Sequence, residues 1–117
     1  WLQNQCEKHV SGETPLHSTV LGKNVTVVKL LLRNADADAN IQNDSGNTPL
    51  HISTHEGLCV VSQLLVDCGC KINVRNKFGE IPLYYAVRGK NVADVELLHK
   101  NSADANIQDG KGNLPLH

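Results

Sequence analysis

Two histidines four residues apart, His51 and His55, are the first candidates for chemistry in this chain. They lie in "GNTPLHISTHEG", residues 46–57. On a helix this spacing places both imidazoles on one face, as a zinc site or an acid–base pair would need. A zincin has Glu directly after its first histidine, but Ile52 follows His51, and Glu56 follows the second histidine. Whether the pair does chemistry or supports a scaffold depends on whether the stretch recurs.

Other reactive side chains form no recognisable site. Cys68-Gly69-Cys70 lacks the two-residue gap of Cys-x-x-Cys, and with Cys59 it would still need a fourth zinc donor, so packing at a helix end is expected instead. There is no Gly-x-Ser-x-Gly motif and no Gly-rich phosphate loop. The carboxylates Asp36, Asp38 and Asp104 lie in turn-rich segments, where side-chain hydrogen bonds stabilise turns. We predict no catalytic residue, no metal and no cofactor.

The stretch around His51 does recur. "GETPLH" begins at Gly12, "GNTPLH" at Gly46, "GEIPLY" at Gly79 and "GNLPLH" at Gly112, at spacings of 34, 33 and 33 residues. A fixed period in this range is typical of stacked repeat arrays. One unit is too short to bury its own apolar face, and stacked neighbours bury it together.

Each unit predicts two short helices. Threonine is a good N-cap and proline suits the first helical position, so Thr14-Pro15 and Thr48-Pro49 are helix starts. The first helices end near Leu21, His55 and Arg88. After a turn, second helices begin at Val25, Cys59 and Val92, with apolar residues three and four apart. An extended link then leads to the next glycine.

The third unit has Ile81 where the other two have a capping threonine. The helix start there loses a cap worth ~1 kcal/mol. We therefore predict that Ile81→Thr stabilises the protein, unless Ile81 is buried against a neighbouring unit, in which case losing its side chain costs more.

The unit "GNTPLHISTHEGLCVVSQLLVDCGCKINVRNKF", residues 46–78, resembles the ankyrin repeat. The resemblance covers residues 12–45, 46–78 and 79–111, followed by a truncated repeat at 112–117. Residues 1–11 stand as the degenerate end of a preceding repeat. It implies one domain, 1–117, with an all-α fold: a solenoid of stacked antiparallel helix pairs with β-hairpin-like fingers.

The resemblance also implies roles for recurring side chains. The histidines His17, His51 and His117 would belong to the scaffold and link neighbouring units by hydrogen bonds. The asparagines Asn40, Asn73 and Asn106 would bond the finger backbone, and in this family the same asparagine is sometimes hydroxylated. His55 would lie on the concave face and contact a partner.

The function that the resemblance implies is non-catalytic protein–protein interaction, with a protein partner held by the finger tips and the concave inner-helix face. Two alternatives are a recognition arm of a larger enzyme, whose catalytic domain lies elsewhere, and a structural spacer. The finger-tip residues expected to face the partner are Asn43, Asp44, Ser45, Asn47, Lys77, Phe78 and Glu80. The inner-helix residues are Leu21, His55, Glu56, Tyr85 and Arg88.

Phe78 has two possible roles. It is the only phenylalanine among 117 residues, and the sister units carry Ser11, Ser45 and Lys111 at its position. It is either an exposed binding anchor or a residue folded down onto the next finger.

The composition excludes several classes of protein. Hydrophobic residues make up 40% and aromatic residues 3%, so a globular chain with an aliphatic core is expected. The formal net charge of −1 offers no basic excess for nucleic acid. No apolar run approaches the roughly 20 residues of a membrane span. Four cysteines without disulfide-scaffold spacing suggest reduced thiols and an intracellular protein, cytoplasmic or nuclear. We also expect a monomer. The start at Trp1 and the end within "PLH" suggest a piece of a longer protein.

Overall fold

Six short helices make up the helical body of the described chain. The computed structural model describes residues 14–34, 38–101 and 110–111. Its helices are α1 (Pro15–Leu21), α2 (Val25–Leu32), α3 (Pro49–His55), α4 (Cys59–Asp67), α5 (Pro82–Arg88) and α6 (Val92–Lys100). The described residues contain no strand. The expected all-α fold is confirmed.

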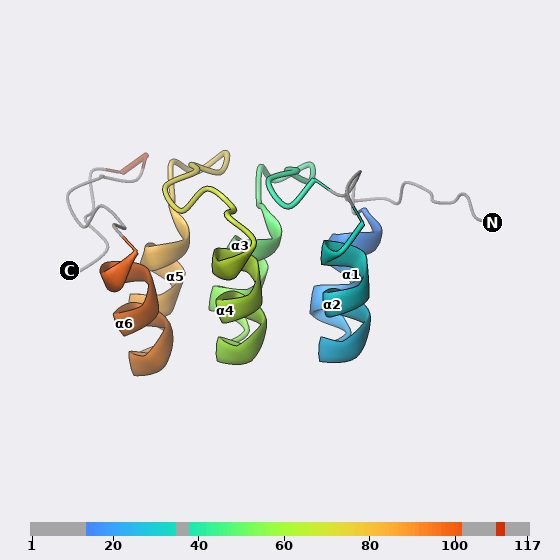
Figure 1. Cartoon of the computed structure of the whole chain (residues 1–117). Coiled ribbons are helices and arrows are strands. Elements are labelled where there is room, and N and C mark those ends of the chain that lie inside the picture. Colours follow the sequence, from blue (N-terminus) through green and yellow to red (C-terminus); the bar gives the residue numbers. More distant parts are fainter. Residues whose placement is uncertain (1–13, 35–37, 102–109, 112–117) are drawn as a thin grey trace.

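The helices form three antiparallel pairs that stand side by side (Figure 1). α1 packs on α2, α3 on α4 and α5 on α6, and each pair packs on the next. The inner helices α1, α3 and α5 form one row, and the outer helices α2, α4 and α6 form a second row. The connections between pairs project as fingers from one edge of the stack. We call residues 38–46 the first finger and residues 71–79 the second finger.

Capping explains why helices of seven residues begin where they do. Thr48 is the N-cap of α3, and its side-chain oxygen accepts from the backbone N–H of His51 at 3.3 Å. The His51 ring accepts in return from the backbone N–H of Thr48 at 3.0 Å, which completes a capping box. Thr14 and His17 repeat this arrangement in α1. Helices this short are marginal alone, so packing must complete their stability.

The cap of α5 corrects the prediction made for Ile81. Ile81 gives no side-chain cap, as expected, but its side chain is fully buried in the core. The N–H of Tyr84, which a hydroxyl would have satisfied, already donates to the Ile81 carbonyl at 3.0 Å. The exception stated for this prediction therefore applies: Ile81→Thr removes buried apolar surface and gains little from the cap, so we expect it to destabilise the protein.

The core is aliphatic and runs through all three helix pairs. Its fully buried members come from both rows of helices and from the residue that precedes α5: Val20, Val28, Leu50, Leu65, Ile81, Ala86 and Leu98. The low aromatic content had predicted a core of this kind.

Backbone hydrogen bonds link neighbouring fingers. The Lys77 N–H donates to the Ser45 carbonyl at 3.0 Å, and the Gly110 N–H donates to the Phe78 carbonyl at 2.7 Å. Gly46 sits at this contact with φ +79°, and a Cβ there would lie 2.8 Å from the Lys77 nitrogen. Only glycine fits both the left-handed backbone and the close approach.

Candidate partner-binding surface

His51 belongs to the scaffold. Its Nδ1 accepts from the Thr48 N–H, so the proton lies on Nε2, which donates to the Glu80 carbonyl of the next unit at 2.8 Å. Burial lowers its pKa from 6.5 to about 4, which keeps the ring neutral. His17 makes the equivalent contact with the Asn47 carbonyl at 2.9 Å. The predicted linking role is confirmed for both residues, and His117 lies outside the described residues.

His55 does not act with His51. It is exposed, and its Nδ1 lies 3.2 Å from Glu56 Oε2. Its ring meets the Tyr85 ring edge-on, with centroids 5.3 Å apart and planes at 79°. His55 therefore stands at the surface of the inner-helix row beside an aromatic neighbour.

Two adjoining hollows lie on this surface, and His55 and Tyr85 line both. The first has a volume of about 200 Å³ and is also lined by Leu21, Asn47, His51, Ile52 and Glu56. The second, of about 290 Å³, is completed by Glu80, Tyr84, Arg88 and Gly89. Leu21 is 47% exposed, a large exposure for an aliphatic side chain. The structure thus brings all five predicted inner-helix residues onto one hollowed surface.

Arg88 is positioned by Tyr84. Its Nη1 donates to the Tyr84 hydroxyl at 2.6 Å, and the guanidinium carbon lies 5.3 Å from the centre of that ring. Tyr84 stands where the other units have the linking histidine, and it is buried. Because tyrosine replaces histidine at this position, the third inner helix carries an exposed cation, Arg88, that the tyrosine holds in place.

Asn76 joins the fingers to the inner helices, and the sequence reasoning missed it. Its Oδ1 accepts from the N–H groups of Phe78 and Glu80 at 2.9 and 3.0 Å. Its Nδ2 donates to Asn47 Oδ1 and to the Tyr85 hydroxyl, both at 2.9 Å. The available signal was recurrence, because Asn43 and Asn76 occupy the same place in successive units.

Tyr85 and Glu80 complete this network. The Tyr85 hydroxyl donates to Glu80 Oε1 at 2.6 Å. Burial raises the pKa of Tyr85 above its usual range, and the hydrogen bond to Glu80 adds to this. The hydroxyl therefore stays protonated and keeps donating at physiological pH.

The predicted finger-tip residues fall into two groups. Asn43 serves its own turn, where its Oδ1 accepts from the N–H groups of Ser45 and Asn47. Asn47 and Glu80 are tied into the Asn76 network. Asp44, Lys77 and Phe78 are exposed, Phe78 by 62%, whereas Ser45 is half-buried. Phe78 is therefore exposed at the tip, and its role as a binding anchor stays a prediction.

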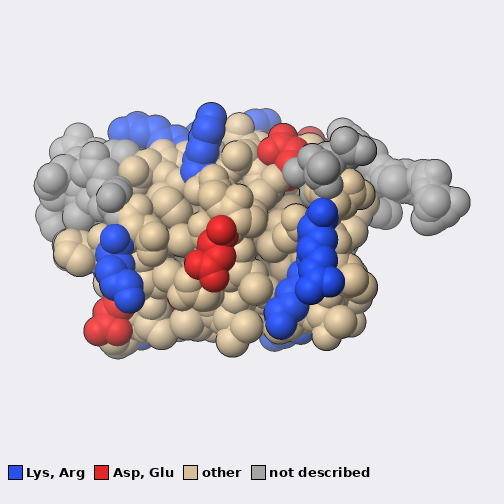
Figure 2. Space-filling model, viewed as in Figure 1, with Lys and Arg blue, Asp and Glu red and all other residues tan. Residues whose placement is uncertain are grey.

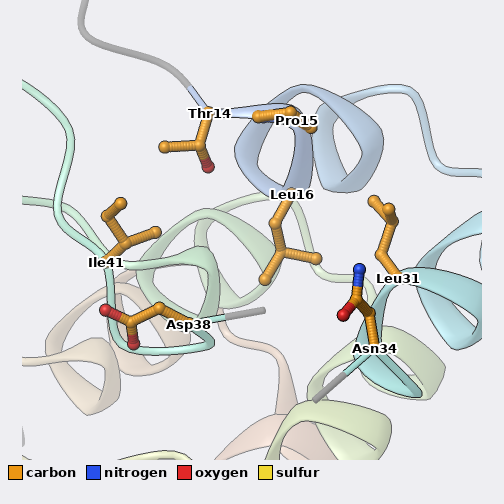
Figure 3. A pocket seen from close by; sticks show the side chains of 7 residues that line it. All are labelled: Thr14, Pro15, Leu16, Leu31, Asn34, Asp38 and Ile41. Atoms are coloured by element: carbon orange, nitrogen blue, oxygen red, sulfur yellow. The ribbon is translucent and has the colours of Figure 1, made fainter. Parts of the chain in front are cut away.

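A third hollow, of about 360 Å³, is lined by residues of the first helix pair and the first finger (Figure 3). Leu16 comes from α1, Leu31 from α2 and Ile41 from the first finger, and Asp38 and Asn34 stand at its side. It is the most apolar of these three hollows in its lining residues. No residue predicted to contact a partner lines it.

The remaining candidates serve structure. Cys59, Cys68 and Cys70 are free thiols, and burial raises the pKa of Cys70 to about 12, which makes it unreactive. Asn40 Oδ1 accepts from the Lys71 N–H at 2.7 Å, as expected for a finger asparagine. Asp38 accepts from the Asn40 N–H. Asp36, Asp104 and Asn106 lie outside the described residues.

Metal ligands do not cluster in the part of the chain that the structure describes, where no group of three or more His, Cys, Asp or Glu residues could hold an ion. Among the same residues, no helix is both long enough and apolar enough to cross a membrane.

Comparison with protein families agrees with the geometry. Residues 1–76 match a family model described as ankyrin repeats (3 copies), and residues 65–117 match a second, described as ankyrin repeats (many copies). The chain belongs to the ankyrin repeat family. Ankyrin repeats are, in general, protein–protein interaction modules and typically non-catalytic. A search of curated proteins finds no match to the chain.

Proposed function

We propose that this chain is a non-catalytic module that holds one protein partner against the inner-helix row and the finger tips together. The inner-helix contacts are Leu21, His55, Glu56, Tyr85 and Arg88. The tip contacts are Asp44, Ser45, Lys77 and Phe78. The division into units 12–45, 46–78 and 79–111 remains a prediction, and all three units supply some of these contacts.

The observation that most supports this proposal is the Asn76 network. One side chain holds the backbone of the second finger's tip through Phe78 and Glu80 and also holds the Tyr85 hydroxyl. Both surfaces are therefore fixed relative to each other before a partner arrives. A pre-organised surface loses less conformational entropy on binding than a mobile one.

The two alternative functions make different use of this surface. A recognition arm of a larger enzyme would use the same contacts and add chemistry outside this chain. A spacer would use none of them. We propose an intracellular setting, in agreement with the free thiols of Cys59, Cys68 and Cys70.

Capture from cell lysate with two matched triple variants tests the proposal. The surface variant is Leu21→Ser, Phe78→Ser and Arg88→Ala. The control is Val60→Ser, Val92→Ser and Lys100→Ala, on the outer helices, where Val60 and Val92 are 60% and 68% exposed. Both variants should unfold at nearly the wild-type temperature, because surface substitutions typically change stability by within about 0.5 kcal/mol each.

We expect the wild type and the control to capture the same proteins and the surface variant to lose them. Capture that survives in the surface variant would overturn the assignment of this surface. Wild-type protein that captures nothing above an unfolded sample would favour the spacer.

A further inference from the structure

The second finger reverses the charge of the first finger at equivalent positions. Lys71 stands where the first finger has Asp38, and Lys77 stands where it has Asp44. The first finger contains no Lys or Arg, and the second contains no Asp or Glu. Arg75 adds a third cation where the first finger has Gln42. The two fingers thus repeat one backbone pattern with opposite electrostatics.

The apolar tip belongs to the basic finger. Phe78 replaces Ser45, and its side chain is 62% exposed. Lys71, Arg75 and Lys77 are exposed as well. The tip is held in shape by Asn76 and by the Gly110 N–H bond to the Phe78 carbonyl at 2.7 Å.

This charge is local. The chain as a whole has a formal net charge of −1. In Figure 2, basic side chains rise along the middle and left of the finger edge, and acidic side chains lie to their right. Glu80, the acid that follows the second finger in sequence, has its Oε1 occupied by the Tyr85 hydroxyl. Exposed cations and an exposed phenyl ring therefore occur together on the second finger, and the first finger has neither.

We propose that the tip of the second finger binds an acidic segment of the partner protein, in which an apolar side chain covers Phe78 and carboxylates face Lys71, Arg75 and Lys77. The inference rests on the proposed function and specifies its partner. A finger that carries exposed cations and an exposed apolar side chain is complementary to a segment that carries carboxylates and an apolar side chain, and such complementarity gives specificity and faster association. Aromatic residues often dominate the binding energy of interfaces.

Selection from a random library of displayed 12-residue peptides, on the immobilised 117-residue chain at low salt, provides the probe. Peptides that bind should be enriched in Asp and Glu around one apolar residue. The affinity of a synthetic consensus peptide should fall at least about tenfold for Phe78→Ser, and by a similar factor for the double variant R75E/K77E. It should also weaken as salt is raised, because salt screens exposed charges.

Two controls separate the tip from general effects. Val60→Ser removes an apolar side chain of similar exposure, 60% against 62% for Phe78, from an outer helix. K29E/K100E makes the same change in net charge as R75E/K77E, at exposed positions of α2 and α6. Both controls should bind the peptide within about twofold of the wild type. Thermal unfolding should show all variants folded.

Several outcomes would overturn the inference. Selected peptides without an acidic excess would do so, as would equal losses for R75E/K77E and K29E/K100E. Competition by heparin is a further test. If heparin displaces the peptide equally well from the wild type and from Phe78→Ser, the finger binds polyanions in general and not a protein segment. Peptides that depend on Leu21 and Arg88 but not on Phe78 would overturn this inference and leave the proposed function standing. An empty selection would count against both.

Discussion

At His51, a backbone donor and a backbone acceptor on opposite sides of the ring fix the neutral form. The folded pKa is about 4, against 6.5 for a free histidine. The unfolded chain therefore takes up this proton first as the pH falls, and stability is lost between about pH 6.5 and pH 4. At pH 4.5 the loss from this residue is roughly 2–3 kcal/mol.

Urea unfolding at pH 7 and pH 4.5 measures this loss. His51→Gln should be less stable at pH 7 and lose less on acidification, whereas His55→Gln should follow the wild type because His55 is exposed. If the wild type and His51→Gln lose the same free energy of unfolding between the two pH values, another group is responsible.

Asp94, unlike His51, is a buried titratable residue whose side chain lacks hydrogen bonds that would offset its burial. Its side chain is fully buried, and neither carboxylate oxygen has a hydrogen-bond partner within the described structure. Burial raises its pKa, and the nearby Ser62 hydroxyl, which bonds to Ser53 Oγ at 2.7 Å, opposes this. An unsatisfied buried polar group of this kind costs about 1–3 kcal/mol.

Asp94→Val, which copies Val61 of the preceding unit, should therefore raise the free energy of unfolding at pH 7 by about 1–2 kcal/mol after the loss of a favourable charge at the start of α6. Because the carboxyl pKa is raised, burying ionised Asp94 costs most at pH values above that pKa. The stability gained by Asp94→Val should therefore shrink as the pH falls toward 4. Glu96→Val, at an exposed position of the same helix, should give no gain. Equal gains for both variants would show that burial is not the cause.

At the scale of the elements, the contact between the two fingers depends on Gly46. Gly46→Ala would place a Cβ 2.8 Å from the Lys77 nitrogen at a φ of +79°. We expect a loss of about 2 kcal/mol or more in chemical denaturation, from left-handed strain and separation of the two fingers.

Gly22→Ala is the matched change. Gly22 has a helical φ of −74°, and a Cβ there would lie no closer than 3.4 Å to its nearest neighbour, Ser18 O. This variant should stay within about 1 kcal/mol of the wild type. If the two alanine variants unfold at the same denaturant concentration, the close contact between fingers contributes little.

The elements were largely predictable because their signals are local. Thr14-Pro15 and Thr48-Pro49 gave the starts of α1 and α3, and the repeat period placed the remaining helices and the linking histidines. The burial of Ile81 in the core could not be decided from the sequence, because it depends on tertiary packing and not on local signals. The contacts of Asn76 with Asn47 and Tyr85 cross between elements, and nothing in its local sequence signals them. Asp94 lies in the first turn of α6, where an acidic side chain is ordinarily favourable, and only packing makes it costly.

Across the whole molecule, burial differs between equivalent positions of successive helix pairs. In α3, residues 49–54 are all buried, whereas α1 buries Leu16, His17 and Val20. Leu65 in α4 is fully buried, but its equivalent in α2, Leu31, is only half-buried. The central pair has a described neighbour on each side. Because each unit of a solenoid is stabilised chiefly by its neighbours, stability should vary along the stack.

Hydrogen exchange followed by mass spectrometry tests this gradient. Amides of α3 and α4 should exchange only through global unfolding, whereas those of α1 and α2 should also exchange when the first pair opens alone. We expect residues 49–67 to exchange at least about tenfold more slowly than residues 15–32, equivalent to ~1.4 kcal/mol. Asp94→Val should slow exchange in α5 and α6 without closing this difference, because its stabilisation acts at the other end of the array. Uniform protection from α1 to α6 would mean that the described chain unfolds as one cooperative unit despite its uneven burial.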